Sequence, residues 1–202
     1  MDKFTYYNLG LERFKSDPLT FYFRLARYKF IWRALQPGDR VLDLACGDGM
    51  GSYVLARKGC RVTGMDIEPE FLEYARREFS AENLTFRAGS ALEGEIGRDW
   101  DVICLIGLFE YLDDEKSLLA LSRIATALRP GGLAFVGTPN ADSKIVATPR
   151  RLSTHHRELN AGRLRELLET QFSRVELFGQ NDEYILPSIP EMSFFLMSRC
   201  QK

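Results

Sequence analysis

Three glycines and two carboxylates are concentrated in one short stretch, VLDLACGDGMG, at residues 41–51. Glycines permit positive φ angles and let a ligand approach the backbone closely, because they carry no Cβ atom. An apolar run precedes them and a segment of helical periodicity follows, which is typical of a nucleotide-binding turn between a strand and a helix. Asp43 and Asp48 would repel a pyrophosphate, so they favour a ligand that carries a ribose and cationic groups.

A dinucleotide fingerprint requires the spacing G-x-G-x-x-G. Here the glycines are Gly47, Gly49 and Gly51, and Ser52 occupies the place of the required third glycine. We therefore rank a dehydrogenase last among the possible functions. The next apolar run, RVTGMD, ends at Asp66, where an acid can accept hydrogen bonds from both ribose hydroxyls of a nucleoside. Together the turn and this acid predict a nucleoside site.

The elements around the turn alternate between two periodicities. Five short apolar runs indicate buried strands: RVLDLA, RVTGMD, LTFRAG, DVICLI and GLAFVGT. Helical patterns separate them: SYVLARKG, PEFLEYARREFS and EKSLLALSRIATALRP. A last helix, GRLRELLETQF, precedes two more strand-like runs, RVELFG and MSFFLMSR. The alternation predicts an α/β fold with a doubly wound parallel sheet, helices on both faces and the glycine turn at the carboxyl edge.

The first 39 residues have a different pattern. From about Leu19 to Gln36, apolar residues recur at helical spacing and would form one stripe: Phe21, Leu25, Tyr28, Trp32 and Leu35. Basic residues lie off this stripe: Arg24, Arg27, Lys29 and Arg33. Two interpretations are open. The segment is either a packed helix with a solvated basic rim or a lid whose basic rim faces an anionic substrate.

Composition excludes several classes of protein. The 202 residues, 45% of them hydrophobic and with a net charge of −1, predict one soluble domain spanning residues 1–202 and argue against nucleic-acid binding. We find neither a membrane span nor a signal peptide and expect a cytoplasmic protein. Four scattered cysteines and two histidines predict neither a disulfide framework nor a metal site.

The motif DxAxGxGxG that begins at Asp43, the acid Asp66, and the later segments FEYL and LRPGG resemble the class I S-adenosylmethionine-dependent methyltransferases. The resemblance runs from about residue 38 to 199. It implies a Rossmann-like sheet of seven strands in the order 3-2-1-4-5-7-6, the last strand antiparallel, and S-adenosyl-L-methionine as cofactor. The sulfonium and ammonium groups of this cofactor explain why carboxylates border the turn.

The resemblance also divides the single domain into a helical lid or cap at 1–39, a cofactor-binding half at 40–140 and an acceptor side at 141–202. Among the cofactor contacts that it implies, the turn contacts the methionine portion through Gly47 and Gly49, and Asp43 orients the amino-acid end. Further along, Asp66 would bind the ribose diol and Ile67 would pack on adenine.

Four positions depart from the family pattern or complete it. Ala45 stands where many members carry glycine. In RAGSALE, Ser90 and Ala91 replace the usual acid and small residue, so a weaker contact to the adenine amino group and a modest cofactor affinity are implied. Leu105, in DVICLIGLFEYL, would line the cofactor's methionine and methyl.

Candidate catalytic residues follow the fourth and fifth strands. Many members have Glu-His where this chain has Glu110-Tyr111, so Glu110 remains as a candidate, the alternative being an acid at the start of a helix. TPN followed by H-x-R-E resembles a subset of these methyltransferases that act on small molecules, quinone precursors or glycan and lipid intermediates. Within it, His155 and His156 could accept a proton near neutral pH, or could merely order the loop.

Basic residues also gather before the last predicted helix: Lys144, Arg150, Arg151 and Arg157. With the basic rim of the N-terminal helix, they predict a locally positive acceptor side and an acceptor that bears carboxylate or phosphate. The candidate substrate-binding residues are Tyr7, Arg24, Arg150 and Arg151. Contact of the basic, aromatic helix with an anionic membrane surface is a less favoured alternative.

The leading hypothesis is thus a methyltransferase that acts on an oxygen or nitrogen of a small, anionic acceptor. Aminopropyl transfer on the same fold is disfavoured by the basic acceptor side. Ser90 and Tyr111 leave room for a non-catalytic S-adenosylmethionine-binding or partner subunit. The sequence predicts neither the acceptor nor an oligomeric state.

Overall fold

The computed structural model describes residues 14–143, 157–187 and 192–202. One sheet runs through them in the order β3-β2-β1-β4-β5-β8-β6-β7. Its strands are β1 Arg40–Leu44, β2 Arg61–Asp66, β3 Leu84–Ala88, β4 Trp100–Ile106, β5 Leu128–Pro139, β6 Arg174–Asn181, β7 Tyr184–Leu186 and β8 Phe195–Gln201. Neighbours among β1 to β5 are parallel, and β8 is antiparallel to both β5 and β6.

This topology confirms the predicted fold class and the predicted order of seven strands. β7 was not predicted, because its three residues, YIL, are too short to show an alternating pattern. It pairs with the end of β6 as an antiparallel hairpin at the edge of the sheet.

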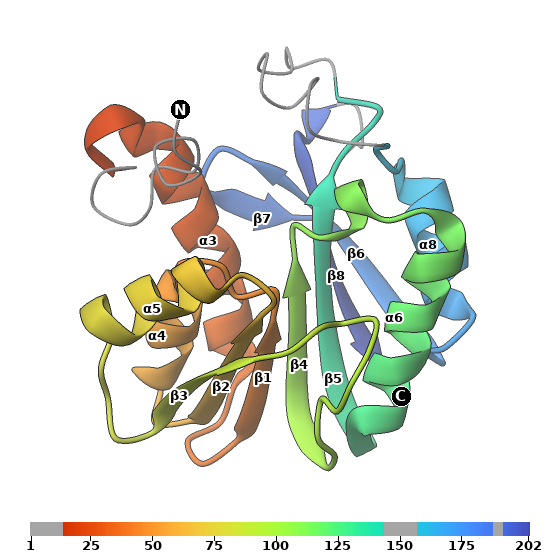
Figure 1. The fold of residues 1–202 in the computed structure, drawn as a ribbon. Coiled ribbons are helices and arrows are strands. Elements are labelled where there is room, and N and C mark those ends of the chain that lie inside the picture. Colours follow the sequence, from red (N-terminus) through yellow and green to blue (C-terminus); the bar gives the residue numbers. More distant parts are fainter. Residues whose placement is uncertain (1–13, 144–156, 188–191) are drawn as a thin grey trace.

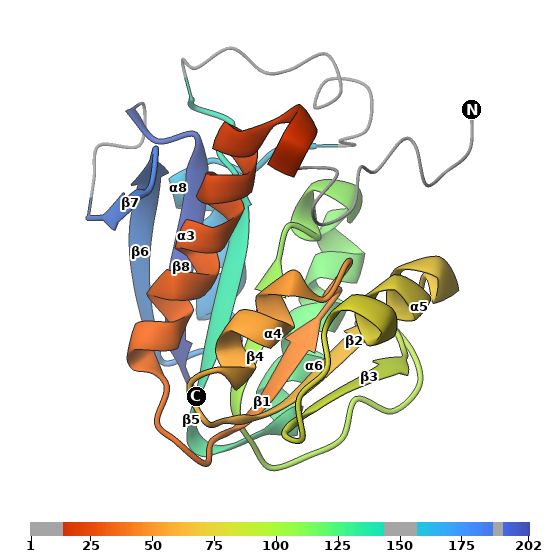
Figure 2. The same ribbon diagram turned by 90° about the vertical axis from the view of Figure 1, so that its left-hand side faces the viewer.

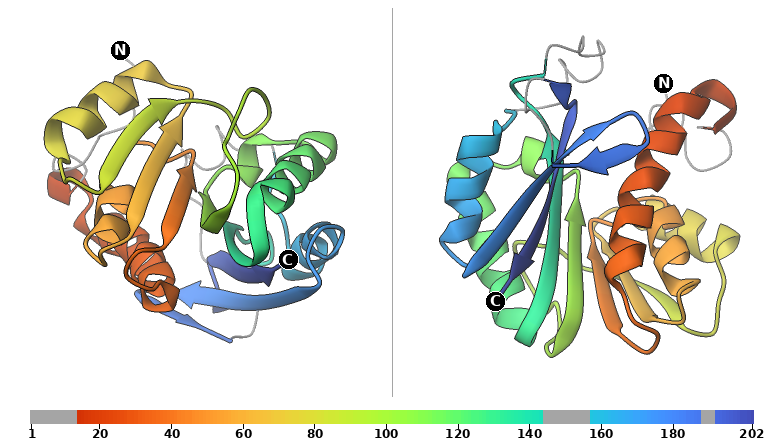
Figure 3. Two further views of the ribbon diagram at one scale, coloured as in Figure 1. Left: turned by 90° about the horizontal axis from the view of Figure 1, so that it is seen from below. Right: turned by 180° about the vertical axis from the view of Figure 1, so that it is seen from behind.

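Helices cover both faces of the sheet. They are α3 Pro18–Ala34, α4 Met50–Ala56, α5 Pro69–Glu78, α6 Asp114–Ala127 and α8 Ala161–Glu169, with a 3₁₀ turn, η1, at Phe109–Tyr111. On one face lie α3, α4 and α5, and on the other lie α6 and α8 (Figures 1 and 3). Side chains cap three of the helix starts, namely Asp17, Asp113 and Asn160. None of the described helices is long and apolar enough to cross a membrane.

Side-chain alternation along β1 divides the core into two layers. Leu42 and Leu44 pack in the layer with α6 and α8, whereas Val41 packs in the layer with α3 and α4. Asp43, two residues after Val41, therefore points toward α3 and α4. A carboxylate is thus placed inside the apolar layer directly beneath the glycine turn.

α3 lies between α4 and the β6–β8 side of the sheet (Figure 2). Its buried positions are Ala26, Tyr28 and Ile31, followed by Leu35 just after the helix. The predicted stripe was therefore only partly right, since Phe21, Leu25 and Trp32 are half-buried. The helix contacts two surfaces at once, so its buried positions do not form a single stripe.

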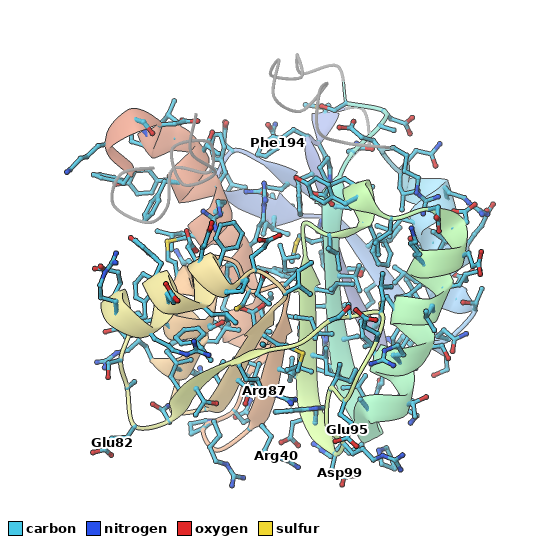
Figure 4. All side chains as sticks on the ribbon, viewed as in Figure 1. Arg40, Glu82, Arg87, Glu95, Asp99 and Phe194 are labelled. Atoms are coloured by element: carbon cyan, nitrogen blue, oxygen red, sulfur yellow. The ribbon has the colours of Figure 1, made fainter. Side chains whose placement is uncertain are left out.

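The two ends of the sheet are easily told apart in Figure 4. Arg40 begins β1 and Asp99 precedes β4, and both lie at the lower end of that view. The carboxyl ends of the parallel strands consequently lie at the opposite edge. There β1 has β2 on one side and β4 on the other, so the chain reverses its strand order at the glycine turn. Open α/β sheets bind ligands at such a switch point.

Candidate functional site

The glycine turn occupies residues 45–49, between β1 and α4. Ala45, Gly47 and Gly49 all have left-handed backbones, with φ angles of 56°, 56° and 78°. The Cys46 amide donates to the Met65 carbonyl at 3.1 Å, which ties the turn to β2. Since an alanine occupies the first of the three left-handed positions, the departure from the family glycine at this position strains the backbone.

Two glycines of the turn are required for different reasons. A Cβ atom on Gly47 would meet nothing within 4 Å, so there is open space beside this residue. A Cβ atom on Gly49 would lie 2.5 Å from the Cβ atom of Ala75 and 2.7 Å from the Phe86 ring. Gly49 therefore lets the turn pack against α5 and β3, and Gly47 borders the space that a ligand could fill.

Asp66 ends β2 beside this open space and holds the turn. Its Oδ2 accepts the Gly47 amide at 2.8 Å and its Oδ1 accepts the Glu68 amide at 3.0 Å. Burial raises the pKa of Asp66, and the backbone hydrogen bonds from Glu68 and Gly47 oppose that rise. Because a carboxylate has about four lone-pair sites, Asp66 keeps acceptor capacity for a ribose hydroxyl beside these backbone donors. Ile67, the next residue, leaves 65% of its surface exposed, as a side chain that packs on adenine requires.

Asp43 lies beneath the turn and is fully buried. The Ser52 hydroxyl donates to its Oδ2 at 2.7 Å and the Tyr28 hydroxyl to its Oδ1 at 3.4 Å. Burial raises the pKa of Asp43 to about 7, the two hydrogen bonds oppose the rise, and Asp66 and Asp48 add to it. Asp43 is thus positioned to support the turn from within, through donors that the sequence-based interpretation had not assigned to it.

Asp48, in the middle of the turn, is paired with the N-terminal helix. The two terminal nitrogens of Arg24 donate to its two oxygens at 3.2 Å each, and the Met50 amide donates to Oδ1 at 3.3 Å. The side chain of Asp48 is 1% exposed and that of Arg24 is 23% exposed. Burial alone would lower the pKa of Arg24, but Asp48 outweighs it and raises the pKa above its ordinary value.

Gly51 completes the contact between α3 and the turn. A Cβ atom there would lie 2.0 Å from Cζ of Tyr28, so only glycine leaves room for the tyrosine ring. Sequence reasoning placed Tyr28 in an apolar stripe and missed its role at the turn. A signal did exist, because a glycine inside a helical pattern often marks the close approach of another segment.

The segment after β3 was predicted to contact adenine. The Ser90 hydroxyl accepts the Leu92 amide at 3.0 Å, and the Ala91 carbonyl accepts from Nε of Arg123 at 3.0 Å. Ser90 is therefore partly engaged within its own loop. Leu105 is completely buried in the layer that faces α6. Its place beside the cofactor's methionine and methyl therefore stays a prediction.

Glu110 lies in η1, after the carboxyl end of β4, and is 5% exposed. A Cβ atom on Gly107 would lie 3.4 Å from its Oε1, so the carboxylate is directed back toward the end of β4. The acid that starts α6 is instead Asp113, which accepts the Lys116 amide at 2.8 Å. Asp113 therefore caps α6, whereas Glu110 lies in the first turn of η1.

Arg157 was counted among the cations of the acceptor side, but it is committed to the protein. Its Nε donates to the Leu112 carbonyl at 2.7 Å, one terminal nitrogen donates to the Ser117 hydroxyl at 2.8 Å, and the other pairs with Asp114. Its amide donates to the Glu110 carbonyl at 3.4 Å. Arg157 thus fastens its segment to the turn after β4 and to the start of α6.

Arg27 is committed in the same way. Its Nε donates to Oε1 of Gln180 at 2.8 Å, and its guanidinium lies 3.5 Å from the centre of the Phe195 ring. The basic rim predicted for α3 therefore loses Arg24 and Arg27 to partners inside the protein. Lys29 and Arg33 are exposed.

The end of the predicted TPN segment lies beside the residue that follows the predicted H-x-R-E segment. Asn140, fully buried, forms a parallel bridge with Leu159, and its side-chain amide donates to the Ser193 carbonyl at 2.7 Å. Six of the predicted site residues lie outside the described part of the chain: Tyr7, Lys144, Arg150, Arg151, His155 and His156.

Comparisons with known proteins agree with this geometry. Residues 41–132 match the model of a family described as "Methyltransferase domain". A ubiquinone biosynthesis O-methyltransferase from Aeromonas salmonicida is 35% identical over 111 residues, which are 53% of this chain and 46% of the relative. A protein of Mycolicibacterium smegmatis, described as a probable S-adenosylmethionine-dependent methyltransferase, is 33% identical over 144 residues, or 69% of this chain and 53% of the relative. The chain thus spans about half the length of these curated relatives.

Solved structures share the fold. The N-methyltransferase NodS from Bradyrhizobium japonicum, in complex with S-adenosyl-L-homocysteine, superposes with a TM-score of 0.69 at 21% identity, over 89% of this chain and 87% of that one. With the strand order, the glycine turn and the acid that ends β2, the family match of residues 41–132 and the sequence relatives show that the chain belongs to the class I S-adenosylmethionine-dependent methyltransferases.

Proposed function

We propose that this protein transfers a methyl group from S-adenosylmethionine to an oxygen or nitrogen atom of a small acceptor. One observation carries the proposal: Asp66 binds the Gly47 amide at 2.8 Å beside open space at the switch point of the sheet. The same carboxylate is thereby oriented for a ribose, and the exposed Ile67 lies next to it for adenine. The carboxylates Asp43, Asp48 and Asp66, which lie in the turn and beside it, suit a nucleoside with cationic groups.

S-adenosylmethionine supplies, when bound, a methyl group already activated on its sulfonium. The chain's own residues then have to position the acceptor and to receive a proton where the acceptor loses one. Glu110 is a candidate for that proton, because its buried carboxylate lies at the carboxyl end of β4. His155 and His156 remain the other candidates, on the residue type and the motif alone.

An oxygen or nitrogen acceptor is supported by two of the similar proteins, one named for O-methylation and one for N-methylation. The anionic character of the acceptor rests on fewer residues than the sequence indicated. Arg24, Arg27 and Arg157 have partners within the protein, so of the arginines predicted to bind substrate, Arg150 and Arg151 remain as the candidates to bind a carboxylate or phosphate.

Calorimetry tests the cofactor site directly. S-adenosylmethionine should bind the wild type, and Asp66→Asn should weaken binding at least tenfold, since a hydrogen bond to a charged group contributes about 1.5–3 kcal/mol. Glu82→Gln makes the same acid-to-amide change at an exposed residue at the lower end of the sheet in Figure 4 and should leave binding unchanged. A wild type that binds no S-adenosylmethionine would exclude the proposal.

Turnover is tested by release of S-adenosylhomocysteine with a set of phenols and amines, each with and without a carboxylate. Glu110→Gln should lower kcat and leave the dissociation constant of the cofactor unchanged if Glu110 receives the proton. Cofactor binding without methylation of any of these acceptors would favour the non-catalytic alternative. Equal KM values for acceptors with and without a carboxylate would exclude the proposal that the acceptor is anionic.

A further inference from the structure

α3 contacts the glycine turn and the two elements that flank it through two carboxylates and one glycine, namely Asp48 in the turn, Asp43 in β1 and Gly51 in α4. Arg24 donates to both oxygens of Asp48 at 3.2 Å, and Tyr28 donates to Asp43 at 3.4 Å while its ring fills the space above Gly51. These contacts join segments about 24 and 15 residues apart, so they belong to the tertiary structure and not to a local turn.

The other side of α3 is fixed to the far half of the sheet. Gln180, fully buried in β6, donates to the Phe23 carbonyl at 2.9 Å and accepts from Arg27 at 2.8 Å. Phe30 packs on Phe178, with ring centres 4.9 Å apart. Because α3 is held on the β6 side, its side chains can hold the carboxylates of Asp48 and Asp43 in fixed positions.

We propose that Arg24 and Tyr28 are positioning residues for the cofactor: from α3 they hold the Asp48 and Asp43 carboxylates in place, and so they set cofactor affinity without needing to contact the cofactor. The inference rests on the proposed function, because it presupposes that the turn binds S-adenosylmethionine. It assigns Arg24 to the cofactor turn and not to the acceptor.

The positioning role can be distinguished from a purely electrostatic effect of the Arg24 charge by comparing the binding of S-adenosylmethionine and S-adenosylhomocysteine. S-adenosylmethionine carries a net positive charge and S-adenosylhomocysteine does not, so removal of the Arg24 charge would by field alone tighten S-adenosylmethionine and leave S-adenosylhomocysteine unchanged. If Arg24 acts by position, Arg24→Met should instead weaken both ligands. We expect about a tenfold loss for Arg24→Met and about a threefold loss for Tyr28→Phe.

Matched controls are available in the same chain. Tyr53→Phe removes a hydroxyl from α4, where the ring packs on Phe79, and Arg163→Met removes an arginine that pairs with Asp114 and Glu166. Both should leave the dissociation constants unchanged. If Arg24→Met is too unstable to measure, Arg24→Lys keeps the charge and loses the two-point contact, and it should weaken both ligands by a smaller factor.

A double-mutant cycle separates positioning from general loss of structure. In an Asp48→Asn background, Arg24→Met should no longer change the dissociation constant, because the carboxylate on which it acts is gone. In an Asp43→Asn background the same holds for Tyr28→Phe. Independent, additive effects in both cycles would overturn the inference, as would tighter or unchanged binding in the single variants.

The pH dependence of binding gives a second readout. The groups that face Asp43 are the donors Ser52 and Tyr28, the acids Asp48 and Asp66, the cation Arg24 and the thiols of Cys46 and Cys104. Loss of the Tyr28 hydroxyl removes a donor to the ionised form of Asp43. Cofactor binding by Tyr28→Phe should therefore strengthen at a higher pH than in the wild type. An unchanged profile, with the wild type binding normally, would count against the inference and leave the proposed function intact.

Discussion

The glycine turn and the segments that follow β4 and β5 both bring charged side chains to the carboxyl edge of the sheet, but they use those charges differently. At the turn, Asp66 retains acceptor capacity next to the open space beside Gly47. In the segment after β5, the guanidinium of Arg157 donates hydrogen bonds to Leu112, Ser117 and Asp114. The number of charged residues alone does not distinguish the two regions. What separates Asp66 from Arg157 is that the carboxylate borders open space, whereas the guanidinium is bonded to neighbouring elements of the protein.

The largest expected effect compares two glycines, each the second residue of its helix. Gly51→Ala at the turn should destabilise the protein by about 3 kcal/mol, because the new Cβ atom overlaps the Tyr28 ring. Gly162→Ala in α8 meets its nearest atom at 3.6 Å and should stabilise by up to about 1 kcal/mol. Urea unfolding of both variants measures the difference. Equal changes in the free energy of unfolding would show that the close contact between Tyr28 and Gly51 does not stabilise the protein.

The next effect concerns the acceptor side. Arg157→Met leaves the buried Ser117 hydroxyl and the Leu112 carbonyl without their donor, and should destabilise by about 2 kcal/mol, allowing for the partly exposed pair with Asp114. Cofactor affinity should not change, because the arginine lies outside the turn. Arg163→Met, on an exposed pair, is the control. A weaker cofactor and normal stability would contradict the division between the two regions.

The acids of the turn also predict how stability depends on pH. Burial raises the pKa of Asp43 to about 7, so between pH 4 and 7 the folded state binds more protons than the unfolded state. Stability without cofactor should therefore fall as pH rises through this window, by at most about 1.4 kcal/mol per pH unit for this group. Asp43→Asn should flatten the slope. The pKa values of Asp101 and Asp114 are lowered, so the stability that these two groups contribute is lost only as the pH falls below about 4.

The smallest effect tests the strained alanine of the turn. Ala45→Gly relieves a left-handed backbone with φ of 56° and should stabilise by about 1 kcal/mol, less the entropy that glycine adds to the unfolded chain. Thermal unfolding would measure it. Should the variant also bind cofactor more weakly, the strain would belong to the binding geometry of the turn and not only to its stability.

Much of this protein follows from local patterns. Alternating apolar runs and helical periodicities indicate the doubly wound sheet, because each strand and helix is defined within a few neighbouring residues. The order of the strands followed from the family resemblance. The spacing from Gly47 to Asp66 gives the cofactor turn, since a βαβ unit brings these two positions to one edge. Three residues of β7 were too few to be recognised in the same way.

Only the tertiary structure assigned the partners of the charged side chains. The sequence contains Arg24, Arg27 and Arg157 as basic residues, and nothing in their neighbourhood indicates Asp48, Gln180 or Asp114 as partners 24, 153 and 43 residues away. Local periodicity reports which face of an element is apolar, whereas a buried ion pair depends on how separate elements meet. For that reason the cofactor turn could be predicted from the sequence, and its support by α3 could not.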